Sequence, residues 1–414
     1  MRAFGRCERV SRRKHAAVVL GMFETGLGVA RSLGRQGIRV IGVDKRRDVG
    51  FASKFVEPSF CPDPLDAGDA FIEHLLRIAS EQDQKPVLFV TSDDYLPSLA
   101  QHRTRLEKAL LLNIPPSETL ESISDKYGQY ELARRAGVAV PATFALKGAA
   151  DVKELREKIP FPVFVKARDV TAWRRIVGGN VKGFVAQTPK ELETRLEALA
   201  DRGLEALVQE LIPGPDSNVY MACCYVSQAG ELIRAFALRK LRQQPPGFGF
   251  GSLAVSVRDE AVLSLGRRYL ESMDYRGIGA IELKQDERDG QLKLIELNAR
   301  YWQQNALADR CEMSFPLAQY QDLTGETPTA ASGYDVNVKW LNALADFDSF
   351  RVYRRRGTLD FATWIRSLRG PKVYSNFATD DPMPGVRAVT NNIAARRPLR
   401  ALLKSIRRTS ERRG

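Results

Sequence analysis

Residues 16–110 alternate short apolar runs with amphipathic segments, and this rhythm constrains the fold more than any other feature of the chain. The runs AAVVLG, IRVIGVD and PVLFV are typical of strands, and the segments GLGVARSLGRQG and AFIEHLLRIASEQ have helical spacing. Strands that alternate with helices pair in parallel, because a parallel pair needs a long crossover connection. The sequence therefore predicts a Rossmann-like parallel α/β domain at 16–112.

The first strand-to-helix turn, GMFETGLG at 21–28, leaves three interpretations open. It lacks the G-x-G-x-x-G spacing of a dinucleotide site, so that interpretation is disfavoured. Tight strand-to-helix packing explains the glycines without any ligand. The third interpretation is a small-molecule site at the carboxyl ends of the strands, with Asp93, Asp94 and Arg31 as candidates.

A second pattern begins after NIPPSE. The segment SDKYGQYELARRAGV predicts a helix capped by Ser124. Its buried side is expected to carry Leu132, Ala133 and Ala136. Strands are expected at FPVFVKARD and ALVQELIPG, and a glycine-rich basic loop at 171–184. From 217 to 300 the pattern is mostly strands, including a hairpin made of GIGAIELKQ, the turn DERDG, and QLKLIELNAR.

This hairpin carries polar side chains on neighbouring strands. Glu296, Asn298 and Arg300 occupy alternate positions, so they are expected to point to one face, and Glu282 lies on the preceding strand. A half-solvated strand explains the pattern without any function. Carboxylate and amide oxygens are also the ligands that Mg²⁺ prefers, and arginine suits a phosphate. Glu282, Glu296 and Asn298 are therefore the candidate metal ligands.

Two lysines and the glycine-rich loop lie upstream of the hairpin. Lys126 begins a helix, and Lys166 ends a strand just before the loop. Backbone N–H groups of a loop with Gly178 and Gly179 can fold over phosphates while lysines neutralise their charge. A solvated surface position is the ordinary alternative for either lysine.

Taken in order, these segments resemble the ATP-grasp ligases over about residues 113–330. The matching stretches are DKYGQYELARRAGVAVPATF, FPVFVKAR, GGNVKG, LVQELIPGPDSNVY, RKLRQQPPGFGFGS, GIGAIELK and IELNARYWQQNALA. The chain looks most similar to the carboxylate–amine ligase branch, with carbamoyl phosphate synthase and D-aspartate ligase. The resemblance implies an ATP-grasp fold after the Rossmann-like domain, and dependence on ATP and Mg²⁺ or Mn²⁺.

The resemblance also implies roles for single residues. Lys126 and Lys166 would contact the ATP phosphates, Asp216 the ribose hydroxyls, and Arg300 the phosphates. The hinge that binds adenine would be formed by Gln209, Glu210, Leu211 and Ile212. A phosphate-facing cation in RKLRQQ falls on Lys240, with Arg239 and Arg242 left open.

The implied reaction joins a carboxylate to an amine. ATP phosphorylates the carboxylate, and the amine attacks the resulting acyl phosphate, so the products are an amide, ADP and phosphate. No protein nucleophile is needed, which agrees with three histidines that lie outside every motif. The expected substrates are small or lipid-linked carboxylates and amines. The alternative from another class is a non-catalytic ATP-binding regulatory or scaffold protein.

The net charge of +13 on the 414-residue chain is concentrated at its ends. Residues 1–15 carry +5 and residues 396–414 carry +7, and 13 − 5 − 7 leaves +1 for the rest. Nucleic-acid binding is not expected, since it calls for basic charge on a folded face. The five cysteines form no metal-ligand spacing, which is typical of reduced thiols in a cytoplasmic protein. No apolar run has the length of a membrane span, and the basic start does not resemble a signal peptide.

Five regions are predicted: a basic tail at 1–15, the Rossmann-like domain at 16–112, the ATP-grasp domain at 113–330, an appendage at 331–395 and a basic amphipathic tail at 396–414. Helices are expected in the appendage at VKWLNALADF and LDFATWIRSLRG. The tail has helical spacing at Leu399, Leu402, Leu403 and Ile406. Peripheral contact with an anionic membrane is one interpretation of this tail, and a solvated tail is the other.

Overall fold

The computed structural model describes residues 15–146, 152–167, 183–331 and 333–394. The chain divides into two compact units, one formed by residues 1–113 and 300–414 and the other by residues 114–299. The sequence placed boundaries at 112/113 and 330/331, so the second differs. Helices α11 (Asn305–Arg310) and α12 (Phe315–Leu323) pack on α1 (Glu24–Arg35), which groups them with the first unit.

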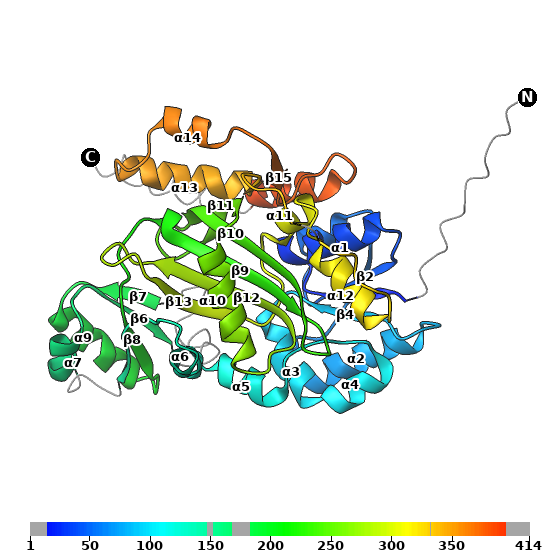
Figure 1. The fold of residues 1–414 in the computed structure, drawn as a ribbon, viewed down its shortest axis with the longest axis horizontal. Coiled ribbons are helices and arrows are strands. Elements are labelled where there is room, and N and C mark those ends of the chain that lie inside the picture. Colours follow the sequence, from blue (N-terminus) through cyan, green and yellow to red (C-terminus); the bar gives the residue numbers. More distant parts are fainter. Residues whose placement is uncertain (1–14, 147–151, 168–182, 332, 395–414) are drawn as a thin grey trace, which may run out of the picture. The chain divides into compact units, whose positions relative to one another are not determined.

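The first unit contains a parallel sheet with strand order β3-β2-β1-β4. Figure 1 draws this part of the chain in blue to cyan. Its strands are β1 (Ala17–Leu20), β2 (Val40–Asp44), β3 (Val56–Phe60) and β4 (Val87–Val90). The helices that accompany the sheet are α1, α2 (Gly68–Ser80), α3 (Leu96–Gln101) and α4 (Arg103–Ala109). The connections β1–β2 and β3–β4 run in opposite directions across the sheet, so right-handed crossovers put α1 and α2 on opposite faces. The predicted parallel α/β domain is confirmed.

The C-terminal part of this unit is an α/β appendage. Its elements are β14 (Lys339–Leu341), α13 (Ala343–Arg355), α14 (Phe361–Ser367), β15 (Lys372–Tyr374) and a helical stretch at 383–394. The helix expected in VKWLNALADF is wrong at its start, because β14 pairs in parallel with β15. Helix α13 begins after Asn342, whose side chain accepts a hydrogen bond from the Ala345 N–H at 3.2 Å.

The second unit contains a small antiparallel sheet with strand order β5-β8-β6-β7. Its strands are β5 (Thr143–Leu146), β6 (Val163–Ala167), β7 (Gly183–Ala186) and β8 (Ala206–Glu210), and its helices are α7 (Val152–Lys158) and α9 (Pro189–Ala200). Val163 and Val165 join Leu192 and Leu196 of α9 in one apolar core. Since side chains alternate along a strand, Lys166 points to the opposite face of β6.

A larger antiparallel arrangement follows, in which β13, β12, β9, β10 and β11 lie side by side in this order. The bounds are β9 (Val219–Val226), β10 (Leu232–Gln244), β11 (Phe250–Val257), β12 (Gly277–Gln285) and β13 (Leu292–Asn298). Helix α10 (Glu260–Glu271) packs on β9 through Gly266, where a side-chain carbon would lie only 2.6 Å from the Ala222 Cβ. Ile281 lies on this side too, so Glu282 faces away from α10.

Two helices, α5 (Ser117–Ser124) and α6 (Lys126–Arg135), pack against each other at the start of this unit. The expected cap Ser124 is wrong, because it ends α5 and its hydroxyl donates to the Leu120 carbonyl. Asp125 caps α6 by accepting a hydrogen bond from the Tyr127 N–H at 3.1 Å. The buried residues of α6 are Gln129, Tyr130 and Ala133. Of the expected Leu132, Ala133 and Ala136, only Ala133 is buried, and the other two are partly exposed.

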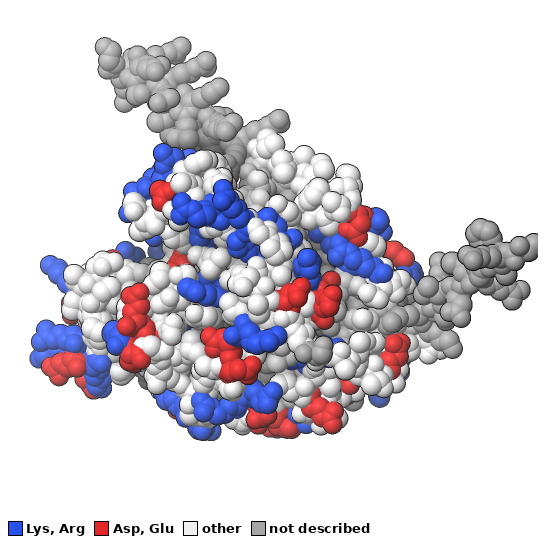
Figure 2. All heavy atoms as spheres, turned by 45° about the horizontal axis from the view of Figure 1, so that its top comes forward, with Lys and Arg blue, Asp and Glu red and all other residues white. Residues whose placement is uncertain are grey.

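The surface and the cysteines agree with the composition. Both signs of charge are interspersed over the face drawn in Figure 2, as the near-neutral charge of residues 16–395 predicts. Cys61, Cys223, Cys224 and Cys311 are buried free thiols. Within the described ranges, every helix is too short or too polar to cross a membrane.

Candidate functional site

The two candidate carboxylates lie directly opposite each other on β12 and β13. Glu282 pairs with Glu296 in the strand register, and Ala280 pairs with Asn298. A register shift follows, because Leu283 pairs with Leu294 and leaves Ile295 as a bulge. The bulge lets Leu294 and Leu297 share the buried face while Glu296 stays opposite Glu282. The expected hairpin is therefore confirmed, with one extra residue that strict alternation did not predict.

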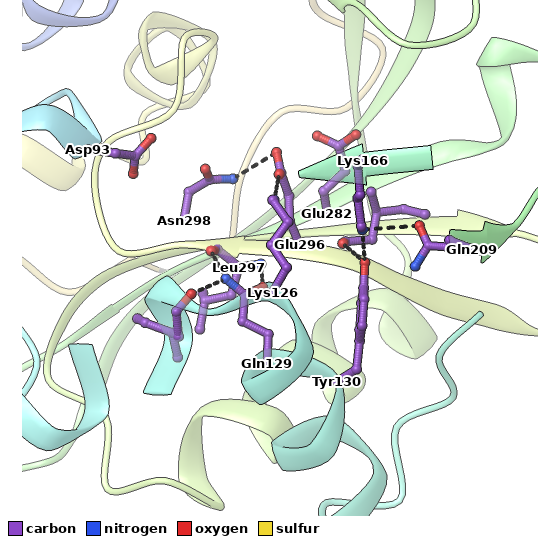
Figure 3. Close-up of polar contacts among 12 residues, drawn as sticks. Asp93, Lys126, Gln129, Tyr130, Lys166, Gln209, Glu282, Glu296, Leu297 and Asn298 are labelled. Carbon is purple, nitrogen blue, oxygen red and sulfur yellow. Dashed lines mark hydrogen bonds and ion pairs between the residues drawn. The ribbon is translucent and has the colours of Figure 1, made fainter. Parts of the chain in front are cut away.

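Each of these carboxylates is held by a lysine from another element. The Lys126 Nζ lies 2.7 Å from Glu296 Oε2 (Figure 3). The Lys240 Nζ lies 2.6 Å from Glu282 Oε2. The Asn298 side chain donates to Glu296 Oε1 at 3.4 Å. Like charges directly opposite on neighbouring strands are destabilising, so the two lysines offset a repulsion that the register creates.

Lys166 is buried and bonds to neutral oxygens. Its Nζ donates to the Tyr130 hydroxyl at 2.6 Å and to Gln209 Oε1 at 3.1 Å, and it lies 4.8 Å from the centre of the Tyr130 ring. Burial lowers the pKa of Lys166 well below its usual value; the nearby Lys126 lowers it further, and Glu296 opposes this. A buried ammonium with neutral partners is a strong site for an anion, since a charge taken out of water needs a counter-charge.

The expected hinge lies at the end of β8. Gln209 shares the face of Lys166 and donates to Thr143 Oγ1 at 2.8 Å. The Glu210 carboxylate bonds to the Arg288 guanidinium and to the Ala142 N–H, so its side chain belongs to an ion-pair network. Leu211 and Ile212 follow the strand. Asp216 Oδ2 accepts a hydrogen bond from the Gly247 N–H at 3.0 Å.

The Glu210 network continues into the hairpin turn. Asp286 is fully buried and accepts hydrogen bonds from Arg288 Nε at 2.9 Å and from Lys293 Nζ at 2.8 Å. These bonds, the one from Arg288 above all, lower the pKa of Asp286 strongly. The network ties the end of β8 to the β12–β13 turn, so it holds the expected hinge against the hairpin.

The register also separates the three cations that alternation left open. Lys240 pairs with Ala254 and Arg242 with Leu253, so a bulge at residue 241 puts their side chains on opposite faces. Arg239 Nε donates to the Ser217 carbonyl at 2.5 Å. The Lys240 side chain reaches Glu282.

Lys284 is a further lysine on the strand face of Glu282 that the sequence analysis did not single out. It lies two residues past Glu282 on the same strand face, and burial lowers its pKa while the nearby Asp216 opposes this. The signal was available, because a lysine at the second position after a candidate metal ligand shares its face. The prediction relied on the spacing of apolar residues, which gives no information about a lysine on the polar face of a strand.

Arg300 lies beyond the end of β13, in the first unit, so its expected place on the strand face is wrong. Strand β13 ends at Asn298, and the Arg300 Nε donates to Asp93 Oδ2 at 2.9 Å. Asp94 lies 3.6 Å from Lys45 Nζ. Arg31 is 5% exposed and bonded to Asp381, so it ties the appendage down. Gly178 and Gly179 lie outside the described residues.

The donor set fits one or two divalent cations that share ligands with a nucleotide. The described residues contain no group of three or more His, Cys, Asp and Glu side chains that could by itself hold a metal ion. Mg²⁺ commonly takes one or two carboxylates and fills its remaining positions with phosphates and water. Glu282, Glu296 and the Asn298 amide oxygen supply hard oxygens of this kind, so these residues could hold the metal.

Comparisons with known proteins agree on the fold. No protein-family model matches the sequence. The D-aspartate ligase of Enterococcus faecium (strain Aus0004) is 27% identical over 257 residues, which cover 59% of this chain and 60% of the relative. The chain therefore spans less than two thirds of the length of this relative.

Two solved structures share the architecture. The ADP complex of an N5-carboxyaminoimidazole ribonucleotide synthetase superimposes with a TM-score of 0.60 at 13% identity, covering 80% of this chain and 82% of that one. The biotin carboxylase domain of Hydrogenobacter thermophilus 2-oxoglutarate carboxylase, solved with MgADP and bicarbonate, gives a TM-score of 0.61 at 18% identity, covering 79% and 74%. These structures show that the chain has an ATP-grasp fold, and the sequence relative agrees with it.

Proposed function

We propose that the chain is an ATP-dependent ligase that joins a carboxylate to an amine through an acyl phosphate, releasing ADP and phosphate. The observation that carries this proposal is the facing pair Glu282 and Glu296, each neutralised by a lysine from another element. A pair of carboxylates set against each other is costly unless a cation occupies the space between them. The likeness to a D-aspartate ligase and to structures solved with ADP supports the same chemistry.

The residues divide the work as follows. ATP supplies the phosphoryl group that activates the carboxylate, and Mg²⁺ offsets the charge that gathers there. Glu282, Glu296 and Asn298 would hold the metal. Lys126 and Lys240 are positioned to exchange their carboxylate partners for phosphate oxygens, and Lys166 presents a further cation.

The other roles expected from the sequence belong to the same proposal. The backbone at Gln209, Glu210, Leu211 and Ile212 would bind adenine, and Asp216 the ribose. Arg300 would face the phosphates, and Gly178 and Gly179 would belong to a loop that covers them and excludes water. Water exclusion matters because an acyl phosphate is readily hydrolysed.

ADP release separates a ligase from a non-catalytic ATP-binding protein. The purified protein is incubated with MgATP and pools of carboxylic acids and amines, and ADP is measured with each pool alone and with both. A ligase releases ADP at a rate that depends on both pools, and Glu282→Gln abolishes that release. The matched control is Glu287→Gln, an exposed residue of the same hairpin. ATP binding without ADP release from any pool would favour the scaffold alternative, and ADP release that never depends on the amine pool would overturn the ligase proposal.

A further inference from the structure

One face of helix α6 holds three consecutive residues of strand β13. Lys126, Gln129 and Tyr130 lie three and four residues apart, which puts them on one side of a helix. The Lys126 ammonium pairs with Glu296, as described above. On either side of Glu296, Gln129 and Tyr130 bind the strand backbone at Leu297 and Ile295.

The Gln129 amide takes the place of a further strand at the edge of the sheet. Its Oε1 accepts a hydrogen bond from the Leu297 N–H at 2.9 Å, and its Nε2 donates to the Leu297 carbonyl at 3.1 Å (Figure 3). The side chain is 4% exposed, so both bonds are made away from water. Gln129 therefore fixes the backbone between the two candidate metal ligands of β13.

Tyr130 performs a second connection, between β13 and Lys166. Its hydroxyl donates to the Ile295 carbonyl at 2.8 Å and accepts from the Lys166 Nζ at 2.6 Å. A phenol has one proton to donate, so its bond to Ile295 leaves the oxygen lone pairs directed at Lys166. Tyr130 is 1% exposed, and burial raises its pKa, so the hydroxyl stays protonated.

We infer that Tyr130 is a positioning residue that fixes Lys166 relative to the strand carrying Glu296 and Asn298, so that a nucleotide phosphate and its metal meet groups set at a constant separation. The inference rests on the proposed nucleotide site but not on the identity of the reaction. Gln209 is the second acceptor of Lys166, and Thr143 holds Gln209 in turn. Without the Tyr130 hydroxyl, the ammonium keeps a single oxygen partner, and the Ile295 carbonyl loses its donor.

The test compares Tyr130→Phe with Tyr269→Phe. The Tyr269 hydroxyl is also buried and also bonds helix α6, but it donates to the Gln129 carbonyl and not to β13. Affinities for ATP, ADP and adenosine are measured by calorimetry with Mg²⁺. Tyr130→Phe should weaken ATP and ADP about three- to tenfold and leave adenosine unchanged, since one hydrogen bond that orders the cation is lost. Tyr269→Phe should leave the ratio of ATP to adenosine affinity unchanged.

A double-mutant cycle shows whether Tyr130 acts through Lys166. In a Lys166→Met background, Tyr130→Phe should have no further effect on that ratio, because the residue it positions is gone. An equal loss for ATP and adenosine in Tyr130→Phe, or an undiminished effect in the Lys166→Met background, would overturn the inference. If Tyr130→Phe does not fold, Thr143→Val carries the test: it releases Gln209 and leaves Tyr130 to hold Lys166, so the ratio should be largely kept, and a fall to the level of Lys166→Met would overturn the inference.

The outcomes separate this inference from the proposed function. A wild-type protein that binds ATP but forms no amide from any pool would overturn the ligase proposal and leave the role of Tyr130 standing. A wild-type protein that does not bind ATP would overturn the role of Tyr130 together with the nucleotide site.

Discussion

Two buried cations, one in each unit, have opposite surroundings. Arg31 in the first unit is 5% exposed, and Lys166 in the second is 7% exposed. The Arg31 Nε donates to Asp381 Oδ2 at 2.9 Å, and its Nη2 donates to two backbone carbonyls. Lys166 bonds to a phenol and an amide oxygen instead.

The difference concerns what compensates each charge. Asp381 meets Arg31 as a full counter-charge and is itself held by the Ser53 hydroxyl and the Lys54 N–H. The ion pair and these hydrogen bonds compensate the Arg31 charge and hold residues 376–381 against α1. The neutral partners of Lys166 orient the ammonium without neutralising it, which leaves the charge for a ligand. Burial of a cation therefore does not identify a site, whereas the type of its partners does.

The largest effect is expected for Glu296, the candidate metal ligand on β13. We expect Glu296→Ala to abolish turnover while the fold stays intact, because loss of a metal ligand removes several kcal/mol of transition-state stabilisation, about 10³-fold in rate. Glu296 and its partner Lys126 are each 22% exposed in their side chains, so water can replace the lost ion pair. ADP release and thermal unfolding are measured together, with the exposed Glu271→Ala on α10 as the control. Wild-type turnover in Glu296→Ala would show that the metal assignment is wrong.

Loss of the Arg31–Asp381 ion pair should lower the unfolding free energy and leave nucleotide binding unchanged. Asp381→Ala leaves the Arg31 charge buried without its counter-ion, which costs about 3–5 kcal/mol of unfolding free energy. Its neighbour Asp380 pairs with Arg35 at the surface, where both side chains are about 40% exposed, so Asp380→Ala should cost about 0–1 kcal/mol. Urea unfolding of the two variants measures the difference. Equal unfolding free energies of the two variants, or a loss of ATP affinity in folded Asp381→Ala, would contradict a purely structural role for the Arg31–Asp381 pair.

The sequence predicted the elements that carry the site better than the contacts within it. The β12–β13 hairpin and the position of Lys166 at the end of β6 follow from alternation and turn residues, which are local. The partners of these residues are separated by 36 to 170 positions, as in Lys166 with Tyr130 and Lys126 with Glu296. Pattern reasoning contains no information on such pairs unless a resemblance supplies it.

Two kinds of feature could not be predicted from the sequence, and each has a physical reason. The bulge at Ile295 and the one at residue 241 each insert a residue, and they reverse the face that alternation assigns to later side chains. Gln129 and Tyr130 were passed over because an apolar stripe does not predict buried polar side chains. Their burial is favourable only because β13 offers backbone groups to bind, and that strand lies far away in the sequence.

A moderate effect is expected for Lys166 itself. Lys166→Ala should weaken ATP binding by about 1.5–3 kcal/mol, the contribution of a hydrogen bond to a charged group, and should leave adenosine nearly unchanged. Calorimetry with both ligands gives the ratio, and Lys153→Ala on α7, an exposed lysine, is the matched control. Equal losses for the two ligands would give Lys166 a packing role like that of Arg31.

The smallest effect is expected for the basic C-terminal tail. Residues 396–414 carry +7 and lie outside the described residues, so their contact with anionic lipid stays a prediction. The described helical stretch before them exposes Met383, Val386, Val389 and Ile393, which are spaced along one side. Apolar side chains next to basic ones favour a membrane surface, where each Lys or Arg contributes about 1 kcal/mol.

Co-sedimentation with vesicles tests this contact. Full-length protein and a chain that ends at Arg396 are mixed with phosphatidylserine-containing vesicles at low and at physiological salt. We expect the full-length protein to pellet more at low salt and to lose that advantage as salt rises, because exposed charges are screened over about 8 Å at physiological ionic strength. A full-length variant with Val386→Asn and Val389→Asn measures the apolar share and should pellet less than the wild type. If the truncated and full-length chains pellet equally at low salt, the tail is solvated and does not bind the vesicles.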